Sequence, residues 1–172
     1  MTDPRPAMDF AADPWDYLGA SEAIDIEHPL VQSTAARLRT GDDIAYARSA
    51  FEYVRDHIAH SLDATAWRAS DALAQGTGLC FAKAHAYVAL LRAGGVQAGL
   101  CYQRFDVLHG LTAILVDDRW VRLDPRGTDL AFSASEDRLA YPDTPILPTV
   151  HAVPPPAVLD ALKSATLPTT LG

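Results

Sequence analysis

The spacing of apolar residues changes at Gly94 and Gly95, and this change constrains the fold more than any other feature of the 172-residue chain. Before the two glycines, apolar and small residues recur every three or four positions, which is typical of helices packed along one face. After them, short runs of β-branched and aromatic residues are typical of strands. Helices followed by antiparallel strands predict an α+β domain, in which the helices pack on an antiparallel β-sheet.

The helical part divides into separate segments. The pattern predicts helices over residues 28–41, 42–58 and 80–93, with a short helical stretch over residues 70–74. Either of the two aspartates that open the second segment can cap it. The third segment has many alanines and few charges, so we expect it to be buried around most of its circumference.

Length and proline content suggest how the chain is organised. A chain of this size suits one domain with a core of its own. We expect a flexible N-terminal tail at residues 1–14, a folded domain at residues 15–146, and a proline-rich C-terminal arm at residues 147–172. Three consecutive prolines at positions 154 to 156 interrupt any continuous helix in that arm, so it holds at most one short helix.

Charge and cysteine content exclude several classes of protein. The net charge is −8 and there is no basic stripe, which argues against binding to nucleic acid. No segment is long and apolar enough for a membrane span, and the N-terminus lacks the features of a secretory signal. With only two cysteines, a disulfide framework is not expected. These features predict a cytoplasmic protein without a membrane partner, and they leave its oligomeric state open.

Cys80 lies at the predicted start of the helix over residues 80–93. A helix N-terminus and a nearby imidazolium both stabilise a thiolate. Gly76 and Gly78 permit a tight approach to the helix and leave room for a substrate beside the sulfur. A cysteine considered alone is more often a core residue, so the nucleophile interpretation needs a histidine from elsewhere in the fold.

A predicted hairpin offers that histidine. Two aspartates separate strand-like segments at residues 109–116 and 119–124. If they form a two-residue turn, Leu111 pairs with Asp124, and His109 becomes a diagonal neighbour of Asp124 on the same face. A four-residue loop preserves this pairing, whereas an odd loop places the two on opposite faces. The even register therefore predicts a Cys-His-Asp arrangement for nucleophilic catalysis.

The cysteines could also have structural roles. Cys101 lies among apolar residues and is predicted to be in the core, although a disulfide with Cys80 is possible if their Cα atoms lie within about 7 Å. Cys80, His85, Cys101 and His109 together offer four zinc-ligating atoms. Their spacing matches no common structural zinc site, and His85 lies about 140° around the helix from Cys80. We therefore predict no metal.

Two stretches carry a resemblance to a known family. Residues 69–102 read ASDALAQGTGLCFAKAHAYVALLRAGGVQAGLCY, and residues 109–127 read HGLTAILVDDRWVRLDPRG. The order of Gly-x-Cys, Leu-Leu-Arg-Ala-Gly-Gly, a strand that opens with histidine, and tryptophan before Leu-Asp-Pro resembles the transglutaminase-like superfamily. This superfamily of Cys-His-Asp enzymes includes candidate bacterial cysteine proteases. The resemblance covers roughly residues 51–127, about half of the chain.

The resemblance implies a papain-like or transglutaminase-like core, with the nucleophile at a helix N-terminus above an antiparallel sheet. It implies Cys80 as the nucleophile, His109 as the base and Asp124 as the residue that orients it, with no metal or organic cofactor. The backbone N–H of Cys80 is a natural oxyanion donor. Gln75 is a candidate second donor, and Trp67 is a candidate lining residue of the substrate cleft.

The chain also departs from the family pattern. Gly110 and Leu111 stand where an aromatic residue and a tryptophan often follow the histidine. Gly99 replaces a frequent arginine, and Arg126 stands where threonine often follows Asp-Pro. These departures leave the three candidate catalytic residues in place but do not transfer a substrate class.

Two functions are consistent with these features. The first is a thiol-dependent acyl-transfer enzyme that acts on a peptide, protein or small amide through a thioester at Cys80, with water or an amine as the acceptor. Water would make it a peptidase or amidase, and an amine would make it a transglutaminase or a related acyltransferase. The alternative is a non-catalytic binding module that keeps the fold and binds a partner through its cleft or its C-terminal arm.

Overall fold

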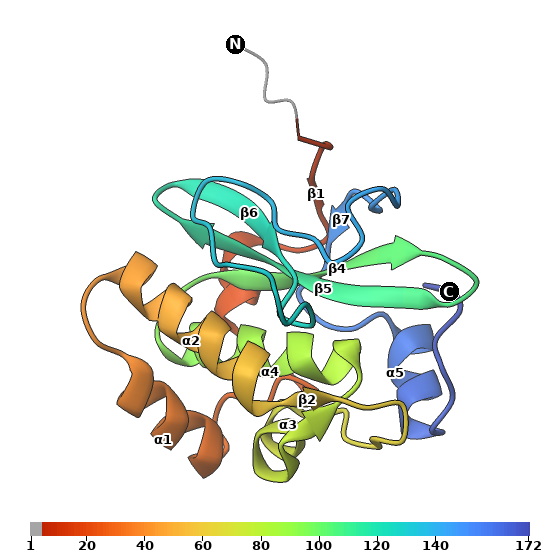
Figure 1. Ribbon diagram of the computed structural model, residues 1–172, viewed down its shortest axis with the longest axis horizontal. Coiled ribbons are helices and arrows are strands. Elements are labelled where there is room, and N and C mark those ends of the chain that lie inside the picture. The colour runs from red at the N-terminus through yellow and green to blue at the C-terminus, as the bar shows by residue number, and fades with distance from the viewer. Residues whose placement is uncertain (1–4) are drawn as a thin grey trace.

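The computed structural model describes residues 5–172 and has helices packed below one antiparallel sheet (Figure 1). The sheet consists of β4 (Ala98–Arg104), β5 (Leu108–Val116) and β6 (Arg119–Leu123), in that order. The helices are α1 (Pro29–Leu38), α2 (Asp43–His57), α3 (Ala69–Gln75), α4 (Cys80–Ala93) and α5 (Pro156–Lys163), with a 3₁₀ helix at Pro14–Leu18. The predicted α+β class is confirmed.

Helix α4 is the centre of the fold. Every residue from Cys80 to Arg92 is buried, so the helix presents no continuous face to solvent, as its composition predicts. It packs against β5 on one side and against the other N-terminal helices on the other. The buried Arg92 guanidinium donates hydrogen bonds to the carbonyls of Gly19, Ala98 and Ala152, which offsets much of the cost of burying its charge.

Local sequence signals account for the ends of several helices. The side chain of Asp42 accepts a hydrogen bond from the amide of Ala45 at 2.8 Å, so the first of the two candidate aspartates caps α2. Helix α1 begins at a proline, which has no amide hydrogen to leave unpaired in the first turn. Gly76 adopts φ of 68° directly after α3, a left-handed conformation that glycine accommodates without strain.

The hairpin between β5 and β6 has the predicted register. Asp117 and Asp118 both have positive φ, 53° and 57°, as a two-residue type I′ turn requires. Val116 pairs with Arg119, and the ladder continues in the same register until β6 ends at Leu123. The even loop therefore places His109 and Asp124 on the same side of the sheet, although Asp124 itself follows the last strand residue.

Residues 5–14 contact the sheet. Strand β1 (Asp9–Phe10) pairs in parallel with β7 (Thr149–Val150), and the Arg5 guanidinium donates to the carbonyl of Trp120 at 2.6 Å. The sequence pattern did not predict these contacts. Residues 1–4 of the predicted tail lie outside the described part of the chain. The division into tail, domain and arm stays a prediction, and α5 is the short helix expected within residues 147–172.

Within residues 5–172, no helix combines the length and the apolar character that crossing a bilayer requires.

Candidate active site

Backbone pairing fixes the chain directly before Cys80. Strand β2 (Ala59–His60) pairs in parallel with β3 (Thr77–Gly78), and α4 begins two residues after β3 ends. A Cβ atom at Gly78 would lie 2.9 Å from Cβ of Ala82, so glycine permits the close passage of β3 over the first turn of the helix. The thiol is thus held at the start of α4, as the sequence predicts.

Cys80 is accessible from a cavity. The residue is 7% exposed and lines a cavity of about 270 Å³. Besides Cys80, most of the lining is apolar, with four polar or charged side chains. The lining residues are His60, Leu62, Leu79, Cys80, Phe81, Phe105, Val107, Leu108, His109, Arg126, Tyr141 and Leu167.

The start of β5 lies directly against the sulfur. The backbone amide of Gly110 donates to Sγ of Cys80 at 3.4 Å. A Cβ at position 110 would lie 2.8 Å from Cδ1 of Phe81, so a larger residue would force β5 away from α4. The glycine that departs from the family pattern therefore permits this close approach, and it brings the neighbouring His109 to the same cavity.

His109 and Asp124 form a buried hydrogen-bonded pair. Nε2 of His109 lies 2.6 Å from Oδ2 of Asp124, whose side chain is fully buried. The backbone amide of Arg126 donates to Oδ1 of Asp124 at 3.1 Å, and that of Ala140 donates to Oδ2 at 3.2 Å. These contacts hold the carboxylate in place against the imidazole.

The surroundings of His109 favour its protonated form. Burial by itself lowers the pKa of His109, but hydrogen bonds with Asp124 and Cys80, together with their charges, raise the pKa to about 9. Because Nε2 contacts Asp124, Nδ1 is the ring nitrogen left for Cys80. An imidazolium at this position stabilises negative charge on the neighbouring sulfur.

Aromatic and cationic residues complete the cavity wall. The ring of Tyr141 packs edge-on against His109 at 4.9 Å and against Phe105 at the same distance. The guanidinium of Arg126 lies 5.4 Å from the ring centroid of Tyr141. Sequence patterns did not indicate Tyr141 or Phe105, because neither belongs to a motif: Phe105 directly follows β4, and Tyr141 lies in the long loop between β6 and β7.

His60 is another site residue that sequence patterns did not indicate. It lines the cavity, and its Nδ1 is buried with no hydrogen-bond partner in the described part of the chain. Burial, and then the charge of Arg126, lower its pKa, which favours the neutral ring. Only the pairing of β2 with β3 places His60 near Cys80, so no local pattern around it marks it as a site residue.

The structure does not bring Gln75 or Trp67 into this cavity. Gln75 is exposed at the end of α3. The Trp67 ring packs beneath the cationic groups of Arg68 and Lys163, at 4.2 Å and 5.3 Å. No contact with Cys80 supports the roles predicted for Gln75 and Trp67.

The described residues do not assemble the alternative sites for the cysteines. Both cysteines are free thiols, and residues 5–172 contain no group of three or more His, Cys, Asp or Glu side chains placed to bind a metal. Nδ1 of His85 contacts the carbonyl of Trp67 at 2.7 Å, away from the cavity. Cys101 is fully buried, and this burial raises its thiol pKa to about 12.

The fold and the site define a class: an α+β domain in which a cysteine at a helix N-terminus meets a hydrogen-bonded His-Asp pair from an antiparallel hairpin. The model of the transglutaminase-like superfamily matches residues 32–125, more than half of the chain. The chain therefore belongs to the transglutaminase-like superfamily, and the resemblance seen in the sequence is confirmed.

A solved structure has the same fold. The crystal structure of a "putative cysteine protease" from Cytophaga hutchinsonii matches with a TM-score of 0.58 and 16% sequence identity. The match covers 69% of this chain and 44% of that one, so this chain corresponds to less than half of that protein. No curated protein matches this chain.

Proposed function

We propose that this protein is a thiol-dependent acyl-transfer enzyme in which Cys80 is the nucleophile, His109 the general acid and base, and Asp124 the residue that orients His109. The observation that carries the proposal is the 2.6 Å contact between His109 and Asp124 beside a sulfur that faces an open cavity. The fold shared with a protein described as a cysteine protease candidate also supports it.

The reaction begins with attack by the Cys80 thiolate on an amide carbonyl, which forms a carbon–sulfur bond and a tetrahedral oxyanion. The first hydrogen bond of α4 runs from the amide of Lys83 to the carbonyl of Leu79, so the amide of Cys80 is free to donate to that oxyanion. His109 then gives its proton to the leaving amine as the carbon–nitrogen bond breaks. A thioester remains on Cys80.

Transfer of the acyl group completes the cycle. Neutral His109 takes a proton from the acceptor, which attacks the thioester and restores the thiolate. Water gives a peptidase or amidase, and a primary amine gives a transglutaminase-type acyltransferase. The substrate is an amide of a peptide, a protein or a small molecule, and the acidic chain is proposed to act in the cytoplasm without a nucleic-acid partner or a cofactor.

Alkylation by iodoacetamide at pH 6, followed by mass spectrometry, tests the nucleophile. We expect Cys80 to react at least about tenfold faster than the free thiol of glutathione, because His109 stabilises its thiolate. The variant His109→Gln should lose this advantage, whereas Cys101→Ser should keep it because Cys101 is buried. Equal and slow alkylation of wild type and His109→Gln would instead favour a binding module that retains only the fold.

The acceptor is identified in a second experiment. The protein is incubated with a library of amide acyl donors and quenched in acid, and the mass of the peptide containing Cys80 is measured. A trapped thioester gives the acyl group. Its decay with and without an added primary amine then distinguishes hydrolysis from transamidation.

A further inference from the structure

We propose that Arg126 makes this site selective for acyl donors that carry a carboxylate near the scissile amide and an apolar group beside it. This inference rests on the proposed function, and it names the substrate class of the same site.

Arg126 is anchored within the His-Asp arrangement. Its backbone amide donates to Oδ1 of Asp124 at 3.1 Å, and this hydrogen bond fixes the backbone of Arg126 beside the carboxylate. Its side chain lines the same cavity of about 270 Å³ as Cys80. The guanidinium lies 5.4 Å from the ring centroid of Tyr141, and that ring lies 4.9 Å from the ring of His109. The cation and the proposed base therefore lie close to the same aromatic ring.

The charge of Arg126 is not balanced within the cavity. No Asp or Glu lines it. The nearby carboxylate of Asp124 is fully buried and already accepts from Nε2 of His109 and from the amides of Arg126 and Ala140. Among the ion pairs formed by residues 5–172, none includes the guanidinium of Arg126.

A guanidinium in a largely apolar cavity recognises a planar anion best. It can donate two parallel hydrogen bonds to a carboxylate, and such charge-assisted bonds are stronger than those to neutral groups. A substrate carboxylate would supply the negative charge that the lining lacks. Arg126 stands where threonine often follows Asp-Pro in the family, and this residue is thus a candidate determinant of substrate choice.

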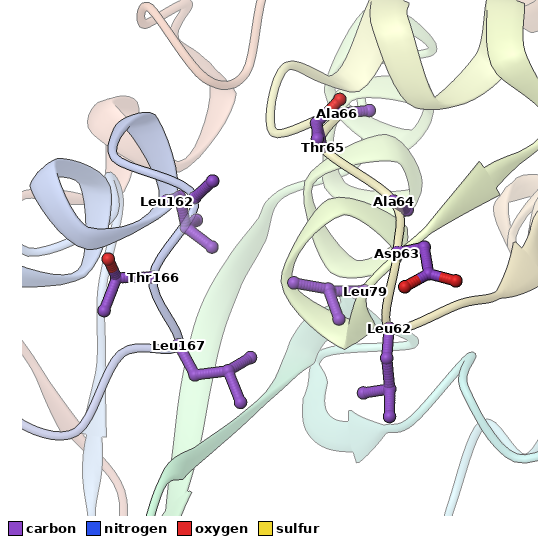
Figure 2. A pocket seen from close by; sticks show the side chains of 10 residues that line it. Leu62, Asp63, Ala64, Thr65, Ala66, Leu79, Leu162, Thr166 and Leu167 are labelled. Atoms are coloured by element: carbon purple, nitrogen blue, oxygen red, sulfur yellow. The ribbon is translucent and has the colours of Figure 1, made fainter.

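Three leucines beside Cys80 form an apolar surface that can bind the apolar part of the substrate. Leu62, Leu79 and Leu167 line the cavity at Cys80 and also an adjoining cavity of about 340 Å³. Figure 2 shows Leu162 and Leu167 of the C-terminal segment on one side of the adjoining cavity, and Leu62 and Leu79 on the other. An apolar group next to the scissile amide can therefore pack against these three leucines while the carboxylate of the substrate meets Arg126.

Two alkylating reagents that differ in charge test the carboxylate preference. Iodoacetate and iodoacetamide both react by displacement of iodide by the thiolate, but only iodoacetate is an anion. In Arg126→Gln we expect the ratio of the iodoacetate rate to the iodoacetamide rate at Cys80 to fall about fivefold. Arg37→Gln removes the same charge from an exposed position on α1 and should leave the ratio unchanged.

Two results of this experiment overturn the proposal. An unchanged ratio in Arg126→Gln would show that Arg126 does not attract the anion. An equal fall in both rates would show that Arg126 acts on the thiol itself and not on substrate choice. A third result concerns the proposed function instead. If iodoacetamide alkylates Cys80 of the wild type as slowly as it alkylates Cys80 of His109→Gln, the proposed function itself is contradicted.

Ligand binding tests the same preference without any reaction at Cys80. Calorimetric titration compares 4-phenylbutyrate with 4-phenylbutyramide, which share the apolar part and differ in charge. We expect the carboxylate to bind more tightly to the wild type and to Arg37→Gln, and we expect Arg126→Gln to lose the difference. Equal binding of both compounds to the wild type overturns the proposal, whether or not the thiol proves reactive.

Discussion

His109 and Asp124 are fifteen positions apart in the sequence, yet their side chains meet at 2.6 Å inside the protein. The even-numbered turn of the β5–β6 hairpin sets both residues on one side of the sheet, and the amides of Arg126 and Ala140 hold the carboxylate. The chemistry proposed for Cys80 depends on this pair, because it determines which nitrogen of His109 faces the sulfur.

Replacement of Asp124 by asparagine should lower activity by about 10²- to 10⁴-fold, because the carboxylate both orients His109 and stabilises its protonated form. The alkaline limb of the pH–rate profile should also move to lower pH, since Asp124 raises the pKa of His109. The measurement is kcat/KM against pH for a donor found by thioester trapping. Asp118→Asn, in the turn of the same hairpin, should change neither quantity. A variant Asp124→Asn with wild-type kcat/KM would contradict the role of the pair.

The pH dependence of the wild type follows from the raised pKa of His109, which is about 9 in the folded protein. Activity should decline above pH 9, because the imidazolium that protonates the leaving amine is lost. The folded pKa exceeds the ordinary value of about 6.5, so the stabilisation from protonated His109 is complete below about pH 6.5 and is lost as the pH rises through 9.

Urea unfolding at pH 7 and pH 10 measures this contribution. The wild type should lose more free energy of unfolding between these two pH values than His109→Gln does. An equal loss in both proteins would show that His109 is not held in its protonated form.

Substitution of Gly110 by alanine should separate β5 from α4, because the new Cβ would lie 2.8 Å from Cδ1 of Phe81. We expect a loss of about 1 to 3 kcal/mol in the free energy of unfolding. Activity at a temperature where the variant remains folded should fall as well, since the amide of Gly110 would leave the sulfur. The double variant Gly110→Ala with Phe81→Leu should regain stability. If Gly110→Ala alone has the stability and the activity of the wild type, the close approach of β5 to α4 contributes to neither.

Lys83 provides a test of the burial around α4. The residue is 1% exposed, and burial lowers the pKa of its ammonium group to about 8. Lys83→Met should therefore raise the free energy of unfolding at pH 7 by about 1 to 3 kcal/mol. The gain should be full below about pH 8 and should shrink as the pH approaches 10.5, where the lysine is neutral in both states.

The matched control for this variant is Lys163→Met, because the side chain of Lys163 is 38% exposed and its ammonium group contacts Glu22. Chemical denaturation at pH 7 and pH 10 compares the two variants. A stability gain of the same size in Lys163→Met would mean that the effect reflects added apolar surface and not relief of a buried charge.

Local patterns in the sequence were sufficient for the elements that carry the three candidate catalytic residues. The helix predicted over residues 80–93 is α4, and the hairpin register predicted from its two turn aspartates is the observed one. Periodicity and turn type depend on neighbouring residues, so they can be read along the chain. The family motifs follow the same segments, which is why the amino-acid sequence alone indicates both the family and the fold class.

Only the tertiary structure decided what surrounds the sulfur. His60 reaches the cavity through the pairing of β2 with β3, and Tyr141 reaches it from a loop that follows the sheet. Gln75, predicted from its position five residues before Cys80, and Trp67, predicted as an aromatic residue of the cleft, do not line this cavity. The sequence by itself determined the helix that carries Cys80 and the hairpin that carries His109. The cavity wall depends on how distant segments pack, because such contacts leave no periodic pattern along the chain.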